Sequence, residues 1–189
     1  MQLNTLSMVH RFLEQSVKPG SFCIDATAGK GRDTALLCRL AGEMGRVLAF
    51  DIQQAAVDQT KALLAAEGLT AEVVLDSHAH MERYAEAGTA DCVVFNFGRL
   101  PGGDPAVFTR ADSSVAALDA ALRVLKPGGT FLICNESNGD TDKDEKWTEI
   151  IGGMIIYKDI ELKAYLVQAG FHDVQIHKKK SWLCITARK

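Results

Sequence analysis

Apolar positions follow two patterns that alternate along the chain. Short apolar runs predict strands, and longer segments with apolar residues three or four positions apart predict helices. The predicted strands are residues 21–26, 45–51, 71–75, 91–95, 130–134, 173–177 and 181–187. The predicted helices are residues 3–17, 32–40, 53–67, 80–87, 111–125 and 159–168. Strands that alternate with helices in this way are typical of an α/β protein with a parallel sheet covered by helices on both faces.

The last two predicted strands are separated by only a few residues. Because a parallel crossover needs about a dozen residues or more, these two strands must run antiparallel to each other. We therefore expect a seven-stranded, mostly parallel sheet with the last strand antiparallel, which is the arrangement of the Rossmann-like class I methyltransferases. A plain nucleotide-binding Rossmann domain would end on a parallel strand. The length of 189 residues suits a single domain over residues 1–189.

Composition narrows the class of protein without identifying it. The chain is 47% hydrophobic and 24% charged, with a net charge of −3, as expected for a globular protein. No apolar stretch reaches about 18 residues, and residues 1–14 lack the pattern of a signal peptide, so we expect a cytoplasmic protein without a membrane partner. The odd number of cysteines without Cys-x-x-Cys spacing predicts buried, reduced thiols at Cys23, Cys38, Cys92, Cys134 and Cys184.

A glycine-containing loop follows the first predicted strand, where doubly wound sheets bind their ligands. The strand ends at Asp25, glycines occupy positions 29 and 31, and a helix opens directly afterwards. The third glycine of the dinucleotide pattern is missing, and Asp33 lies near its place. S-adenosylmethionine has no phosphate but carries a sulfonium and an ammonium group, so Asp25 and Asp33 suit its amino-acid end. The alternative is a tight strand-to-helix turn without a ligand.

Two further strand ends complete a predicted adenosine site. Asp51 ends the second strand, about 20 residues after Gly31, where an acid accepts hydrogen bonds from the ribose hydroxyls. Its alternative role is to cap the helix that follows. After the third strand we expect Ser77 or His78, rather than His80, to border the adenine. The His-x-His pair lacks a third and a fourth ligand, so we predict no metal.

The fourth strand leads into the segment Asn-Phe-Gly-Arg-Leu-Pro-Gly-Gly-Asp at residues 96–104. Amine methyltransferases often place Asn or Asp here, where it holds the nucleophile in line with the methyl group. An alkyl amine has a pKa of about 10.4 and must first lose a proton. We therefore predict Asn96 and Asp104 as catalytic residues, with Asp104 as the proton acceptor. The alternative is a glycine-rich turn in which Asn96 caps the strand.

Residues 25–34, 50–53, 77–78 and 96–104 together resemble the bacterial "putative rRNA methylase" family. The resemblance implies a class I methyltransferase fold, S-adenosylmethionine as cofactor, and methylation of the aminomethyl group of a modified wobble uridine in tRNA. The implied cofactor contacts are Asp25, Thr27, Gly29, Gly31, Asp33, Thr34, Asp51, Ile52, Gln53, Ser77, His78 and Asn96. After the fifth strand the family usually has Tyr-x-Gly-His, where this chain has Asn-Glu-Ser-Asn-Gly at residues 135–139.

Two charged segments of the sequence favour different kinds of methyl acceptor. A basic C-terminal tail, joined by Arg99 and Arg110, is compatible with a phosphate track for RNA, although a solvated charge run is the commoner meaning of such a pattern. Its members are Lys178, Lys179, Lys180, Arg188 and Lys189. The acidic residues 136–149 favour a small-molecule acceptor instead. We therefore predict an RNA substrate, tRNA ahead of rRNA, with a small molecule as the alternative.

Two other classes of function explain the sequence less well than a methyltransferase does. A non-catalytic nucleotide-binding protein would not explain the segment at residues 96–104, and a nicotinamide dehydrogenase would not explain the missing third glycine. A homodimer is compatible with the sequence.

Overall fold

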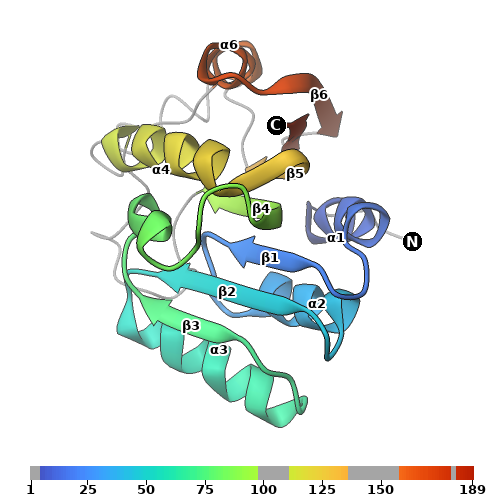
Figure 1. The fold of residues 1–189 in the computed structure, drawn as a ribbon, viewed down its shortest axis with the longest axis vertical. Helices are drawn as coiled ribbons and strands as arrows, with labels where there is room; N and C mark the ends of the chain where they lie inside the picture. Colours follow the sequence, from blue (N-terminus) through green and yellow to red (C-terminus); the bar gives the residue numbers. More distant parts are fainter. Residues whose placement is uncertain (1–4, 98–110, 136–157, 180–181) are drawn as a thin grey trace.

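A computed structural model of the chain describes residues 5–97, 111–135, 158–179 and 182–189. Seven strands form one sheet in the order β3-β2-β1-β4-β5-β7-β6 (Figure 1). Their bounds are β1 Phe22–Asp25, β2 Arg46–Asp51, β3 Glu72–Leu75, β4 Ala90–Phe97, β5 Leu125–Asn135, β6 His172–Lys179 and β7 Trp182–Arg188. Strand β7 pairs antiparallel with β5 and with β6, whereas β1 to β5 pair in parallel. The predicted sheet with its reversed last strand is confirmed.

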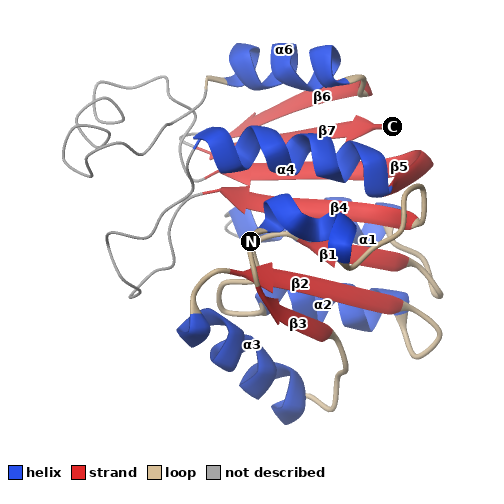
Figure 2. Ribbon diagram, turned by 60° about the vertical axis from the view of Figure 1, so that its left-hand side comes forward, coloured by secondary structure: helices blue, strands red, loops and turns tan. Residues whose placement is uncertain are grey.

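Helices lie on both faces of this sheet (Figure 2). Their bounds are α1 Thr5–Ser16, α2 Arg32–Ala41, α3 Gln54–Ala66, the 3-10 helix η1 His78–Arg83, α4 Ala111–Val124 and α6 Asp159–Ala169. The core is divided by the sheet: α1, α2 and α3 pack on one face, and η1, α4 and α6 on the other. Successive strand residues therefore enter opposite layers, as Cys23 and Ile24 do in β1. No described helix is long and apolar enough to span a membrane.

The central strands are buried on both faces. In β4, Cys92, Val93, Val94 and Phe95 are at most 1% exposed, as expected of a parallel strand with helices on both sides. All five cysteines are buried and free, in β1, α2, β4, β5 and β7. Burial raises the pKa of the Cys92 thiol to about 12, which keeps it protonated and unreactive. The prediction that the five cysteines are buried is confirmed.

Most predicted elements are shifted by one or two residues at an end, and η1 and β5 are shifted further. The helix predicted over residues 80–87 is the shorter η1, which begins earlier because the Ser77 hydroxyl accepts a hydrogen bond from the Ala79 N–H at 3.2 Å. Helix α3 begins at Gln54 rather than at Gln53, which is its N-cap. Strand β5 begins at Leu125 rather than at residue 130, and its register against β4 shifts between Ala90 and Cys92.

The terminal hairpin separates the cations of the predicted basic tail. Because β6 runs in the same direction as β5, Lys178 lies at the edge of the sheet where the parallel strands end. Arg188 pairs in register with His172, the first residue of β6, and therefore lies at the opposite edge. Lys178 and Arg188 therefore do not form one cluster of cations. Arg99 and Arg110 lie outside the described residues.

Candidate functional site

Residues 26–31 connect β1 to α2 and lie across the ends of the neighbouring strands. We call them the β1 loop. The Ala26 N–H donates to the Val94 carbonyl in β4, at 2.9 Å. The Ala28 N–H donates to the Phe50 carbonyl at the end of β2, at 2.8 Å. The loop is therefore fixed at the point where strand order reverses from β1–β2 to β1–β4, the usual ligand-binding position of such sheets.

Both predicted loop glycines adopt left-handed backbone. Gly29 has φ 54° and Gly31 has φ 79°, conformations that cost other residues about 1–2 kcal/mol. A Cβ on Gly31 would also lie 2.9 Å from the Thr60 Cα of α3. The turn and its packing on α3 are thus sufficient to require glycine at position 31, as the ligand-free interpretation proposed. The glycines position the loop, and its ligand has to be argued from the side chains around it.

Asp25 is the buried acid of the site, with only 2% of its surface exposed. Its carboxylate accepts hydrogen bonds from the Thr34 hydroxyl at 2.6 Å and from the Thr27 N–H at 3.1 Å. Burial, and then the negative charge of Asp33, raise the pKa of Asp25 to about 7 despite these two bonds. A positive charge beside the β1 loop would stabilise the ionised form of Asp25, which favours a cationic ligand over a pyrophosphate.

Asp51 connects the β1 loop to the start of α3. One carboxylate oxygen accepts a hydrogen bond from the Gly29 N–H at 3.0 Å, and the other from the Gln53 N–H at 2.9 Å. Since Gln53 is itself the N-cap, Asp51 is not the capping residue of this helix. A carboxylate has about four acceptor sites, so each oxygen can accept a further bond. The neighbouring Ile52 is 56% exposed, an apolar surface at the same strand end.

The two histidines after β3 face different partners. His78 Nδ1 lies 3.0 Å from the Ala26 carbonyl, and the His78 ring packs edge-on against Phe95 at 5.8 Å. Burial lowers the pKa of His78, so the neutral ring donates its Nδ1–H to that carbonyl. His80 Nδ1 instead contacts the Asp76 carboxylate at 2.7 Å. Among the described residues, no group of three or more His, Cys, Asp or Glu is arranged to hold a metal.

Asp76 is a polar side chain at this edge that the sequence prediction left out. Its carboxylate accepts a hydrogen bond from the Tyr84 hydroxyl at 3.0 Å, in addition to its contact with His80. The hydrogen bond to His80 is the largest cause that lowers the pKa of Asp76. The sequence feature that could have identified Asp76 is the one that identified Asp51, an acid at the end of a strand.

Asn96 connects the end of β4 to the β1 loop. Its backbone N–H donates to the Thr27 hydroxyl oxygen at 2.7 Å, and its side chain is exposed. The structure therefore brings the predicted residues of β1, β2, α2 and β4 to one edge of the sheet, with Ser77 and His78 directly after β3. Asp104 lies outside the described residues.

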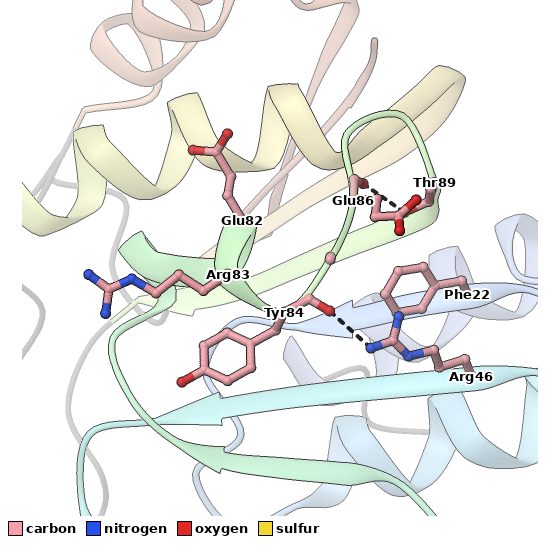
Figure 3. Close-up of a pocket in the computed structure, with 8 residues that line it drawn as sticks. Phe22, Arg46, Glu82, Arg83, Tyr84, Glu86 and Thr89 are labelled. Carbon is pink, nitrogen blue, oxygen red and sulfur yellow. Dashed lines mark hydrogen bonds between the residues drawn. The ribbon is translucent and has the colours of Figure 1, made fainter.

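A hollow of about 410 Å³ lies at the opposite edge of the sheet (Figure 3). Phe22 and Arg46, the first residues of β1 and β2, line it. The Arg46 guanidinium lies 4.4 Å from the centre of the Phe22 ring and donates to the Tyr84 carbonyl at 3.0 Å and to Glu72 at 3.1 Å. The Arg46 guanidinium therefore already has partners within the protein. The hollow lies at the other end of the strands from the β1 loop.

Known proteins are similar to this chain in both sequence and fold. The family model described as "Putative rRNA methylase" matches residues 47–151. The chloroplastic tRNA (mnm(5)s(2)U34)-methyltransferase of Arabidopsis thaliana is 36% identical over 133 residues, which are 65% of this chain and 48% of that protein. The chain thus spans about half the length of this curated relative.

Two solved structures match along almost their whole length. A "putative rRNA-methylase" from Clostridium thermocellum has a TM-score of 0.79 and 30% identity, with 100% of this chain and 99% of that chain covered. A "putative methyltransferase" from Streptococcus mutans, solved in complex with SAH, has a TM-score of 0.74 and 26% identity, with the same coverage. The family match and these two structures together define a class I methyltransferase that uses S-adenosylmethionine. The chain belongs to the "Putative rRNA methylase" family.

Proposed function

We propose that this chain transfers a methyl group from S-adenosylmethionine to an amine on RNA, namely the aminomethyl group of a modified wobble uridine in tRNA. The observation that carries the proposal is the likeness to the Arabidopsis enzyme, whose name specifies a modified uridine at position 34 of tRNA. The family description, an rRNA methylase, supports RNA as the wider substrate class. The chemistry of the described residues is compatible with a cationic methyl donor.

The charges around the β1 loop fit this cofactor. Asp25 and Asp33 face its amino-acid end, where an ammonium group would relieve their mutual repulsion. Asp51 would accept hydrogen bonds from the ribose hydroxyls while still holding the Gly29 N–H. Ile52 would cover one side of the adenine, which gives its exposed surface a purpose. Thr27, Thr34 and Gln53 hold these acids in place through the bonds described above.

The acceptor is held, in this proposal, by residues after β4. S-adenosylmethionine supplies a methyl group bound to a positively charged sulfur. Transfer is a displacement at carbon, so the protein contributes mainly alignment of the nucleophile and exclusion of water. Asn96 stands at the end of the central strand, tied to the β1 loop through Thr27, and would orient the amine. Asp104 would accept the proton that the amine must lose before it attacks.

Radiolabelled methyl transfer tests the proposal. The full chain is incubated with methyl-labelled S-adenosylmethionine and one of four acceptors: tRNA carrying aminomethyl-modified wobble uridine, the same tRNA without the modification, rRNA, or a metabolite extract. We expect label only in the modified tRNA, and digestion to nucleosides should place it on the wobble uridine.

Label in the metabolite extract would instead support the small-molecule acceptor that the acidic residues 136–149 favour. Those residues lie outside the described part of the chain. Label in rRNA alone would keep the RNA class and overturn the wobble-uridine assignment. The Asp51→Asn variant serves as the control for cofactor-dependent labelling.

A further inference from the structure

Helix α1 is anchored rigidly beside the proposed cofactor site. Val9, Leu13 and Val17 are each at most 4% exposed and lie in the same core layer as α2. His10 follows Val9 directly, so its backbone is fixed by the burial of its neighbours. Farther along, the Phe12 ring packs against His177 of β6 with ring centres 4.5 Å apart. The position of His10 is therefore determined by contacts on both sides of the helix.

The His10 side chain reaches from α1 to the first turn of α2. His10 Nε2 lies 3.0 Å from the Asp33 carboxylate, and the two side chains are 26% and 13% exposed. Among the described residues, His10 is the one side chain that hydrogen-bonds to this carboxylate. A hydrogen bond donated to a largely buried carboxylate holds that carboxylate in one position.

Asp33 in turn acts on Asp25, whose carboxylate is buried below the β1 loop. Its negative charge is the second largest cause of the raised pKa of Asp25, after burial. The negative charge of Asp33 disfavours the ionised form of Asp25, so a positive group beside both carboxylates would stabilise them. In the proposed site that group is the ammonium group of the methyl donor.

We propose that His10 is a positioning residue for the methyl donor: it holds the Asp33 carboxylate in the orientation that binds the ammonium group of S-adenosylmethionine. The inference rests on the proposed cofactor site. It assigns a function to α1, which precedes all of the motifs that identify that site. It also predicts which part of the cofactor is affected when His10 is replaced.

The test compares two ligands that share an adenosine but differ at the other end. S-adenosylmethionine carries the amino-acid group, and methylthioadenosine lacks it. Calorimetry on the full chain should show that His10→Ala weakens S-adenosylmethionine about tenfold, the value of one charge-assisted hydrogen bond. Binding of methylthioadenosine should stay unchanged. His10→Gln should restore most of the loss, because its amide can donate to Asp33.

Controls separate positioning from loss of structure and from failure of the site itself. Arg11→Ala, an exposed position on the same helix, should leave both ligands unaffected. Asp33→Asn should weaken S-adenosylmethionine alone, and the double variant His10→Ala/Asp33→Asn should lose no more than Asp33→Asn does.

Three results would overturn parts of this account. Equal weakening of both ligands by His10→Ala would assign His10 a merely structural role. No weakening by His10→Ala, with a loss in Asp33→Asn, would overturn the proposal and leave the cofactor site intact. No loss in Asp33→Asn would show that the cofactor site itself is wrongly assigned at this position.

Discussion

The two edges of the sheet carry the same types of charged residue and use them differently. At the edge where the parallel strands end, carboxylates are buried or half-buried and accept hydrogen bonds from backbone N–H groups, as Asp25 and Asp51 do. At the edge where the strands begin, exposed cations pair with exposed acids, as Arg46 does with Glu72. The first arrangement holds negative charge where water is excluded, and the second leaves charges solvated and mutually neutralised.

This difference shows why the hollow of Figure 3 is not the candidate site despite its volume. A ligand there would compete with pairs that are already complete. A cationic ligand at the β1 loop would instead stabilise the ionised form of Asp25, whose pKa is raised first by burial and then by the negative charge of Asp33. The two edges are therefore distinguished by whether their charged groups already have partners, and not by the size of a cavity.

The largest effect is expected from Asp51→Ala at the first edge. The substitution removes both proposed ribose contacts and the anchor of Gly29. Two hydrogen bonds to a charged group are worth about 3 kcal/mol together, so affinity for S-adenosylmethionine should fall about a hundredfold. Calorimetric titration measures it. An unchanged dissociation constant would remove Asp51 from the site.

Glycine-to-alanine substitutions at the two edges should differ in how much unfolding free energy they cost. Gly31→Ala forces left-handed backbone and brings its Cβ to 2.9 Å from Thr60, so we expect a loss of about 3 kcal/mol in unfolding free energy. Gly20→Ala lies at the other edge with φ 85° and no atom within 4 Å of the added Cβ. Its expected loss is about 1 kcal/mol. Urea denaturation compares the two variants, and equal losses would contradict the packing argument.

Asp25 should make both stability and binding depend on pH. Its pKa of about 7 exceeds the ordinary value of 3.8, so the folded protein keeps a proton that the unfolded chain releases. The resulting stabilisation is complete below about pH 4 and is lost as the pH rises to about 7. Asp25→Asn should abolish this part of the pH profile of urea unfolding.

The same group should release a proton when a cationic ligand binds near neutral pH. Binding enthalpies measured in buffers of different ionisation enthalpy would reveal the release. Enthalpies independent of the buffer would contradict it.

The smallest effect is expected at the second edge. Arg46→Ala removes the exposed pair with Glu72 and the contact with Phe22. The side chain is 49% exposed, so solvent screening limits the loss in unfolding free energy to about 1 kcal/mol. Affinity for S-adenosylmethionine should not change. A marked loss of affinity, measured by the same titration, would show that the two edges are coupled.

The sequence predicted the sheet because hydrophobic period and short connections constrain it strongly. The antiparallel β7 followed from the few residues between the last strands, and the structure confirms it. The predicted strand begins five residues too late because Pro127 and Gly128 are residue types typical of turns, whereas the chain forms an irregular strand there. Acids at strand ends located the proposed site because all parallel strands end at one edge.

Contacts between distant segments were outside the reach of sequence patterns. Nothing in the sequence spacing of His10 and Asp33 predicts that their side chains meet. The contact depends on how α1 packs against α2 in the folded protein. The basic tail was interpreted as one surface because its members are close in sequence. The hairpin places Lys178 and Arg188 at opposite edges. The roles of Asn96 and Asp104 stay predictions.

Competitive calorimetry with S-adenosylmethionine and NAD tests the central claim most directly. The claim is that the acids around the β1 loop make a site for a cationic adenosine ligand. We predict that S-adenosylmethionine binds the unmodified chain, that Asp51→Ala loses this binding, and that NAD, with its pyrophosphate, does not compete. Absence of S-adenosylmethionine binding at millimolar concentration, or its displacement by NAD, would contradict the account.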